Sequence, residues 1–504
     1  MAVPFYITTA ISYPNGRPHI GHAYEAIAAD AIARFQRARG RDVRLVTGTD
    51  EHGLKMAQTA RRHGRDTLEF ADEMSGYFRD MCAALDISYD AFVRTSEPRH
   101  HEASIAVWKA MEAAGDLYLD RYEGWYSVRD EAFYDESELV DGEGGERVSP
   151  QGTPVEWTQE ETWFFRLSKY QQPLLDFYAS NPAFIQPDTR RNEVLRFVEG
   201  GLKDLSVSRT SFDWGVPVPG SPGHVMYVWV DALTTYMTGV GFPDREGDWA
   251  RYWPADVHLI GKDIVRFHAV YWPAFLMSAG LPLPKQVYAH GFLLARGEKM
   301  SKSLGNVVDP MALAERFGVD ALRYFLLREV TFGQDGSYSA EAIVSRCNAE
   351  LANSFGNLAQ RSLSMIFKNL DGIIPAPGEA DEDRALLAQV EQACQSLTDQ
   401  FERFAFSAGL EAWMAAVFAC NQYVDASAPW ALKKTDPARM AEVLGTLVAA
   451  IRRLTVAVAP IIPGSADRLL TLIDSGAGGA AIAQPQPIFP RLELVGEEGE
   501  AACG

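Results

Sequence analysis

Short apolar runs that end in glycine and polar residues recur in the first 300 residues of the chain. Four of them cover residues 3–9, 43–47, 256–260 and 286–289. After the first run, apolar positions recur at helical spacing from about His19 onward. Parallel sheets bind ligands beyond the carboxyl ends of their strands, where such glycine and polar residues collect. The pattern therefore predicts an α/β fold, with a doubly wound parallel-sheet domain of the Rossmann type that binds a nucleotide.

Two later stretches depart from this alternation. Residues 115–223 are rich in Trp, Tyr and Phe and contain extended-looking pieces, which predicts a β-containing insertion that splits the sheet domain. After about residue 336 helical periodicity dominates and predicts an all-α helical-bundle domain. We assign five apolar positions to one face of a helix in this domain: Leu410, Trp413, Met414, Val417 and Phe418. The tail after Ser475 is rich in Gly, Ala and Pro, and we expect it to be poorly packed.

Composition narrows the class of protein. A chain of 504 residues is too long for one ordinary core, so we expect two to four domains. Its 47% hydrophobic and 23% charged residues are typical of a folded protein, and no apolar run has the length of a membrane span. The formal net charge of −20 argues against a broad basic surface for nucleic acid. The same net charge does not exclude a protein that binds RNA through one local patch.

The five cysteines are scattered, odd in number and never spaced C-x-x-C. This pattern argues against a disulfide framework and against a cysteine zinc site, and it favours a reducing compartment, the cytoplasm. Because the first residues already read as a strand, we expect no signal or transit peptide.

Two motifs carry candidate chemistry. His19-Ile20-Gly21-His22 lies where a turn passes into a helix, and helix N-termini attract phosphate because their backbone N–H groups point outward. The alternative is that two histidines lie near a turn by chance. Residues 299–303 read Lys-Met-Ser-Lys-Ser and follow the fourth run, which suits a cationic loop that grips a leaving pyrophosphate. The alternative there is an ordinary solvated basic loop.

Together these two motifs, in this order, resemble the paired motifs of class I aminoacyl-tRNA synthetases. Within that class, the flanking segments 10–16, 48–53, 227–232 and 261–268 resemble the methionyl-tRNA synthetase family. The resemblance covers nearly the whole chain. It implies that methionine is activated with ATP and Mg²⁺ to methionyl-adenylate and then transferred to the terminal adenosine of its tRNA.

The resemblance also assigns residues. The implied catalytic residues are His19, His22, Lys299 and Lys302. The implied ATP-binding residues are His19, Gly21, His22, Gly261, Asp263, Lys299, Ser301 and Lys302. Asp263 could instead be an ordinary helix cap. Arg209 matches a family arginine near the active site, and the alternative is that it is a surface residue.

The implied methionine-binding residues are Ala10, Ile11, Tyr13, Asp50, Trp229, Ala232, Tyr236, His268 and Trp272. Asp50 would pair with the substrate ammonium, and the aromatic rings suit a thioether because sulfur–aromatic contacts are favourable. Without the resemblance, each aromatic residue would be read as core. Ile11 and Leu233 occupy positions where other branches of the family carry Leu and Pro. Because both residues are apolar, we expect this difference to change the shape of the pocket and not the identity of the substrate.

The resemblance divides the chain into catalytic first half 1–115, connective insertion 116–225, catalytic second half 226–325, stem-contact linker 326–380, helical anticodon-binding domain 381–480 and tail 481–504. Relatives hold zinc through cysteines in the insertion, but none lies between Cys82 and Cys347, so we expect no structural zinc or other bound metal. Asn357, Arg361 and Trp430 match the family's anticodon readers. A core position is the alternative for Trp430. Because the chain ends soon after the helical domain, we expect a monomer.

Three other functions stay open at this point. A class I synthetase for leucine, isoleucine or valine would need a large editing domain, and the cysteine enzyme would need zinc. A smaller nucleotidyltransferase would not need the helical half. An RNA-binding scaffold with a decayed active site would not need the intact histidines and lysines of the two motifs.

Overall fold

The computed structural model describes residues 2–130, 132–142, 145–295 and 308–494. The chain forms two compact units, one of residues 1–83 and 87–290, the other of residues 84–86 and 291–504. In the described ranges, no helix combines the length and the apolar character that crossing a membrane requires.

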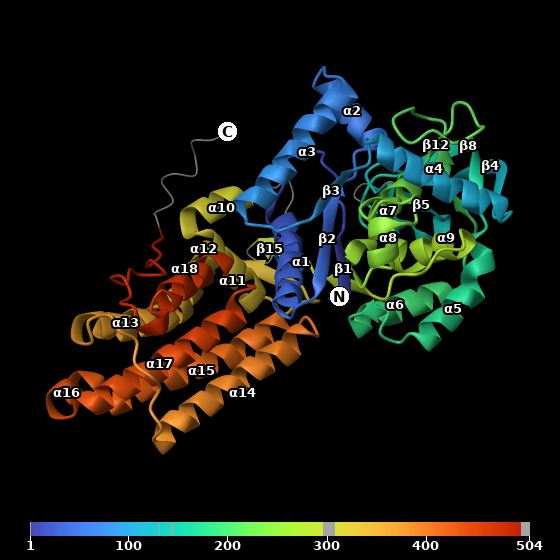
Figure 1. Ribbon diagram of the computed structural model, residues 1–504. Coiled ribbons are helices and arrows are strands. Elements are labelled where there is room, and N and C mark those ends of the chain that lie inside the picture. The colour runs from blue at the N-terminus through green and yellow to red at the C-terminus, as the bar shows by residue number, and fades with distance from the viewer. Residues whose placement is uncertain (1, 131, 143–144, 296–307, 495–504) are drawn as a thin grey trace. The chain divides into compact units, whose positions relative to one another are not determined.

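The first unit is built on a six-stranded parallel sheet in the order β3-β2-β1-β13-β14-β9 (Figure 1). Ile7 at its centre is in register with Leu45 on one side and Val257 on the other. The strands are β1 (Pro4–Thr9), β2 (Asp42–Thr49), β3 (Ala91–Arg94), β9 (Ile185–Gln186), β13 (Val257–Gly261) and β14 (Val287–His290). The helices outside the insertion are α1 (Ile20–Ala38), α2 (Leu54–Arg62), α3 (Thr67–Ala84), α4 (Pro98–Ala113), α7 (Val228–Thr238), α8 (Gly247–Tyr252) and α9 (Trp272–Ser278).

The four apolar runs of the sequence are the four central strands, which confirms the predicted parallel sheet. Sequence reasoning missed both edge strands. β9 has only two residues and comes from within the insertion, and β3 is a four-residue strand with no glycine-rich end. Strands this short give no periodicity from which to find them.

The insertion contains an antiparallel sheet in the order β10-β8-β4-β5, and the two extended pieces predicted after residue 116 are one strand, β4. Its elements are β4 (Leu117–Ser127), β5 (Ala132–Tyr134), β6 (Val140–Asp141), β7 (Arg147–Val148), β8 (Glu156–Phe165), α5 (Gln171–Ser180), α6 (Asp188–Glu199), β10 (Leu205–Ser206), β11 (Ser208–Arg209) and β12 (Val225–Met226). Phe165 of β8 packs edge-on against Phe275 of α9, with ring centroids 4.9 Å apart. The insertion therefore shares one hydrophobic core with the helices around the parallel sheet.

The second unit is mainly helical, and α14, α15 and α17 pack alongside one another (Figure 1). Its elements are β15 (Leu293–Ala295), α10 (Pro310–Phe317), α11 (Val319–Glu329), β16 (Gly336–Tyr338), α12 (Ala340–Cys347), a π-helical segment (Asn348–Gly356), α13 (Asn357–Asn369), α14 (Asp381–Phe401), α15 (Phe406–Ser427), α16 (Pro429–Thr435), α17 (Pro437–Val458) and α18 (Pro463–Asp474). This confirms the predicted helical domain.

One packing prediction in this unit is wrong. Phe418 is 50% exposed, whereas Leu410, Trp413, Met414 and Val417 are buried, because Phe418 lies about 80° around α15 from Leu410 at 3.6 residues per turn. Most of the described tail residues, 475–494, are exposed, as expected, although a few contacts hold this segment in place.

In the tail, Ile482 is buried, and the Asn348 side chain donates to the Leu492 carbonyl at 2.9 Å and accepts from the Leu492 N–H at 2.8 Å. Gln360 donates to the carbonyl of Pro485 at 3.1 Å. These hydrogen bonds involve backbone groups of the tail. Composition and hydropathy therefore could not predict them.

Candidate active site

The N-terminus of α1 is held by two histidines in a capping box. Nδ1 of His19 accepts from the Gly21 N–H, and Nδ1 of His22 accepts from the His19 N–H, both at 3.1 Å. Their rings lie 3.8 Å apart. Because each Nδ1 acts as an acceptor, the proton of each neutral ring is on Nε2. A Cβ at residue 21 would lie 2.9 Å from the His19 ring, so glycine is required there.

One turn further along α1, Glu25 accepts a hydrogen bond from Nε2 of His290 at 2.8 Å. His290 is the last residue of β14, and its ring packs edge-on against Tyr24 at 5.5 Å. Burial raises the pKa of Glu25, and the hydrogen bond from His290 opposes this shift. Sequence reasoning missed both residues, although His290 stands at the end of a predicted strand and Glu25 follows His22 by three positions.

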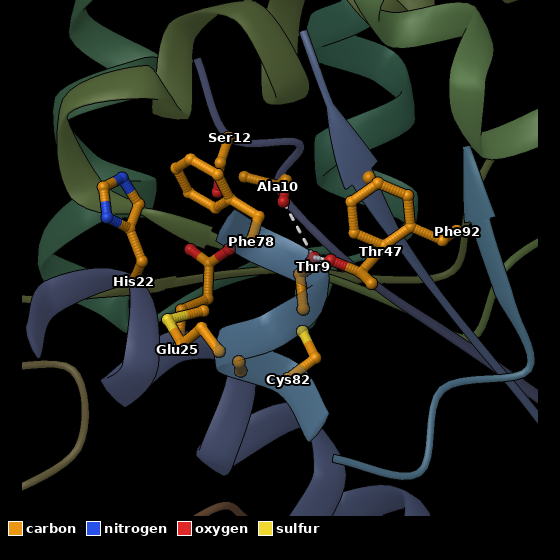
Figure 2. Close-up of a pocket in the computed structure, with 12 residues that line it drawn as sticks. Thr9, Ala10, Ser12, His22, Glu25, Thr47, Phe78, Cys82 and Phe92 are labelled. Atoms are coloured by element: carbon orange, nitrogen blue, oxygen red, sulfur yellow. Dashed lines mark hydrogen bonds between the residues drawn. The ribbon is translucent and has the colours of Figure 1, made fainter. Parts of the chain in front are cut away.

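Figure 2 shows the pocket that these groups border, between the ends of the central strands and helices α1 and α3. Its empty space, part of which is open to solvent, amounts to about 290 Å³. The lining residues are Thr9, Ala10, Ser12, His22, Glu25, Ala26, Thr47, Gly48, Phe78, Met81, Cys82 and Phe92. Burial raises the pKa of the Cys82 thiol to about 12, so Cys82 lines the pocket as an uncharged group.

Asp50 lies immediately beyond β2 and is 8% exposed. The Ser12 N–H donates to the Gly48 carbonyl at 3.0 Å, and the Asp50 N–H donates to the Ser12 carbonyl at 2.9 Å. These two bonds extend the β1–β2 pairing beyond the sheet and hold Asp50 beside the segment that contains Ala10 and Ile11. The N–H of Met56 donates to the hydroxyl of Tyr13 at 2.9 Å, which ties the same segment to α2.

Helix α7 carries three of the predicted pocket residues, Trp229, Ala232 and Tyr236, at spacings that place them on one face. The Tyr236 hydroxyl lies 2.6 Å from Nε2 of His268, and Nδ1 of His268 lies 2.9 Å from the Ile264 carbonyl. His268 must therefore donate from Nδ1 and accept at Nε2. Burial lowers the pKa of His268 to about 4, which keeps the ring neutral at neutral pH.

Two more aromatic contacts complete this wall. Trp229 stacks on Phe267, with ring centroids 3.8 Å apart and planes 5° from parallel. Trp272 is fully buried, and its indole N–H donates to Nε2 of His258 at 3.3 Å. Nδ1 of His258 then donates to the Thr8 hydroxyl at 2.8 Å, and burial holds the pKa of His258 well below its usual range. The aromatic wall is thus fixed to β1 and β13 by hydrogen bonds between neutral groups.

Of the remaining predicted residues of the first unit, Gly261 and Asp263 lie at the carboxyl end of β13, whereas Arg209 belongs to β11 in the insertion. Gly261 ends β13, and a Cβ there would lie 2.7 Å from Oδ1 of Asp263. Arg209 is buried rather than on the surface: its guanidinium donates to the Ser208 carbonyl at 2.6 Å and lies 4.6 Å from the Tyr227 ring centroid. Lys299, Ser301 and Lys302 lie outside the described residues. Among the described residues, no group of three or more His, Cys, Asp or Glu side chains is arranged to hold a metal ion.

Both halves of the chain match families of known proteins. The family described as tRNA synthetases class I (M) matches residues 5–363, and the anticodon binding domain of methionyl tRNA ligase matches residues 374–481. A methionine–tRNA ligase of Brucella suis biovar 1 is 58% identical over 98% of this chain and 99% of its own. The chain belongs to the methionyl-tRNA synthetase family.

Structural similarity agrees with this assignment. The Mycobacterium tuberculosis methionyl-tRNA synthetase in complex with methionyl-adenylate has a TM-score of 0.94 at 55% identity, covering 97% of this chain and 100% of that one. A methionine–tRNA ligase of Rhizobium meliloti is 57% identical over 97% of this chain and 98% of its own. The reaction of this chain is therefore the ATP-dependent ligation of methionine to tRNA. The other synthetases, the smaller nucleotidyltransferase and the decayed scaffold are set aside.

The anticodon-domain match contains Trp430, which lies on α16 and is 49% exposed, so it is not a core residue. The guanidinium carbon of Arg361 lies 5.6 Å from the Trp430 ring centroid, and Arg361 also pairs with Asp425 at 3.4 Å. Asn357 is exposed four residues before Arg361 on α13. The structure thus brings together Arg361 and Trp430, which are 69 positions apart in the methionyl-tRNA synthetase sequence.

Proposed function

We propose that the carboxyl edge of the parallel sheet forms methionyl-adenylate and that His19 and His22 stabilise the reacting phosphate. The observation that supports this most directly is the capping box. Because both Nδ1 atoms are used on the backbone, both rings hold an Nε2–H in a fixed orientation at a helix N-terminus, where anions are favoured. Donors that need no rearrangement are the ones that lower a transition state most.

In this proposal the carboxylate of Asp50 binds the methionine ammonium. Its position beyond β2, held to Ser12 by a backbone hydrogen bond, supports the role because a fixed carboxylate orients an ammonium better than a mobile one. The substrate carboxylate then attacks the α-phosphorus of ATP in line. An O–P bond forms as the bond to pyrophosphate breaks, and Mg²⁺ enters with the triphosphate and leaves with pyrophosphate.

The thioether is proposed to contact Ala10, Ile11, Tyr13, Trp229, Ala232, Tyr236, His268 and Trp272. The neutral state of His268 supports this, since a charged imidazolium would attract water into an apolar pocket. Leu233 is fully buried and adjoins Ala232, so its side chain shapes the packing behind α7. A pocket that works by apolar fit separates substrates that differ by one methylene by only about 1–3 kcal/mol, so homocysteine should be activated to some extent.

ATP is proposed to contact His19, Gly21, His22, Gly261, Asp263, Lys299, Ser301 and Lys302, with Lys299 and Lys302 on the leaving pyrophosphate. Asn357, Arg361 and Trp430 are proposed to read the tRNA anticodon. The half-exposed Trp430 beside a guanidinium supports that role, because unpaired bases stack on such surfaces. We further propose that the enzyme acts as a monomer and holds no structural zinc.

Amino-acid-dependent exchange of pyrophosphate into ATP tests the proposal. Each of the twenty amino acids is supplied in turn, and exchange is expected with methionine alone at physiological concentration. A His22→Gln variant should lose about 10²–10³-fold in exchange rate while it keeps its methionine affinity. Wild-type exchange with a different amino acid would overturn the proposed pocket, and an unimpaired His22→Gln variant would overturn the role of the histidines.

A further inference from the structure

A buried carboxylate between two imidazoles lies behind the proposed methionine pocket. Oδ2 of Asp231 is 2.5 Å from Nδ1 of His52, and Oδ1 of Asp231 is 2.5 Å from Nε2 of His100. Asp231 and His100 are fully buried, and His52 is 3% exposed. The three residues come from three different elements: α7, the loop after β2, and α4.

The cluster contacts helix α7 on a different side from the proposed methionine-binding residues. Trp229, Ala232 and Tyr236 lie on one face of the helix, and Asp231 lies toward the opposite side, about 100–160° around the helix from each of them at 3.6 residues per turn. Thr238, two turns after Asp231 on the same opposite face, lies 2.9 Å from Nδ1 of His100. His100 thus contacts α7 at two points on the side away from the pocket.

The other partner of Asp231 is two residues from Asp50. His52 belongs to the segment 49–53, in which Glu51 is also buried and is bound at both carboxylate oxygens by Arg94 of β3, at 2.7 and 2.9 Å. The N–H of Glu51 donates to the Thr95 hydroxyl at 2.8 Å. Glu51 therefore fixes this segment to β3, and His52 fixes it to α7. Asp50 immediately precedes both anchors.

We propose that Asp231, through His52 and His100, is a positioning residue that sets the distance between the Asp50 carboxylate and the methionine-binding face of α7. The cluster does not touch substrate. It joins the element that would hold the ammonium to the element that would hold the side chain, so it acts on both ends of one amino acid. This inference rests on the proposed assignment of Asp50 and α7 to methionine.

The energetics favour a fixed spacing. A buried carboxylate is tolerated only when it is paired, and the two imidazoles hold the pKa of Asp231 well below its usual range despite the burial. Since the two hydrogen bonds leave opposite oxygens of one planar group, moving either partner by a fraction of an ångström weakens one of them. A displacement of about 1 Å in a reacting group lowers rate by about 10²-fold, so a small loss of register between Asp50 and α7 has a measurable effect.

The test separates positioning from stability by comparing variants in steady-state pyrophosphate exchange, with active enzyme counted by the burst of adenylate formation. We expect Asp231→Asn to raise the KM for methionine about tenfold or more, with the KM for ATP changed less than twofold. Asp383→Asn is the matched control. Asp383 is as fully buried as Asp231 and is paired with Arg439 in the other unit, so its loss should lower thermal stability without moving the KM for methionine.

If Asp231→Asn does not fold, two pairs of histidine variants still test the proposal, and each pair compares an amide substitution with an apolar one. An amide nitrogen in His52→Asn occupies roughly the place of Nδ1 and can still donate to Asp231, whereas His52→Leu cannot. His100→Gln likewise keeps a donor near Nε2, and His100→Met removes it. We expect the amide variants to stay within threefold of wild type in the KM for methionine and the apolar variants to raise it about tenfold.

The outcomes distinguish this inference from the proposed function. If wild type shows no methionine-dependent exchange, the proposed function fails. If wild type exchanges normally but apolar and amide variants share the same KM for methionine, or if ATP and methionine are affected equally, the positioning role is wrong. A shift confined to methionine in the apolar variants supports it.

Discussion

His19 and His22 together cap the N-terminus of α1: the His19 imidazole accepts the N–H of Gly21 in the first turn, and the His22 imidazole accepts the N–H of His19 at the N-cap. Their rings lie 3.8 Å apart. The same atoms that cap the helix therefore determine which nitrogen of each ring keeps its proton. Capping and the proposed catalysis make different demands on the side chain, and a substitution can separate them.

We expect His19→Asn to keep the stability of α1 and to lose the reaction. Asparagine is among the best N-cap residues, so the free energy of unfolding should change by less than about 0.5 kcal/mol, whereas His19→Ala should cost about 0.5–2 kcal/mol. Both variants lack Nε2–H and should exchange pyrophosphate about 10²–10³-fold more slowly. Thermal unfolding and exchange rates check the two effects separately. An active His19→Asn variant would show that the imidazole serves only as a cap.

Lys302→Ala should collapse methionine-dependent pyrophosphate exchange while methionine binding stays nearly intact. The side chain is proposed to act on the leaving pyrophosphate, which is absent when methionine binds alone. Binding is measured by calorimetry without ATP, and the drop in exchange should be about 10²–10³-fold. Equal losses in binding and exchange would contradict the role and point to damage to the whole site.

The neutral state of His268 predicts a loss of stability in mild acid. Burial lowers its pKa from the ordinary 6.5 to about 4, so below pH 6.5 the unfolded chain binds a proton that the folded chain refuses. Stability contributed by this group is therefore complete above pH 6.5 and falls as the pH drops toward 4, by about 3 kcal/mol at most.

Urea unfolding at pH 7, 6 and 5 measures this effect. The His268→Gln variant, which has no titrating group, should lose less stability than wild type over that interval. The comparison is needed because His258, also buried with a lowered pKa, is present in both proteins. Parallel pH profiles of the two proteins would mean that folding does not lower the pKa of the His268 ring.

The parts of the site that sequence could predict are those written in contiguous motifs. His19 to His22 and the strand ends at residues 50 and 261 follow from local pattern, because a cap or a strand end is decided within a few residues. The four central strands follow for the same reason. Local pattern also predicted the helical domain, because its apolar residues recur at helical spacing over long helices.

Contacts between distant segments could not be predicted in this way. Glu25 meets His290 across 265 positions, and His52 meets Asp231 across 179. The place of each residue in the sequence does not identify its partner, and only the fold brings the partners together. The hydrogen bonds that hold the tail could not be predicted for a related reason, since Asn348 binds the backbone of Leu492 144 residues away.

The absence of a zinc requirement is testable on the intact enzyme. The insertion has no cysteine between Cys82 and Cys347, and its folded core uses aromatic contacts such as the stacked and buried pair of Phe165 and Tyr170 at 5.5 Å. We expect elemental analysis to find less than about one zinc per ten chains, and overnight dialysis against a chelator to leave thermal stability unchanged, since structural zinc contributes directly to folding. One zinc atom per chain would overturn this expectation.

Trp430→Ala should weaken aminoacylation without slowing adenylate formation. Base stacking on an aromatic residue contributes about 1–3 kcal/mol, so the KM for tRNA should rise by roughly 5- to 150-fold while pyrophosphate exchange stays at the wild-type rate. Phe418→Ala is the matched control, because Phe418 is equally exposed on α15 of the same unit and has no proposed role. If both variants weaken tRNA binding alike, the effect is one of exposed aromatic surface in general. If only Trp430→Ala does, the ring beside Arg361 is the one that a base occupies.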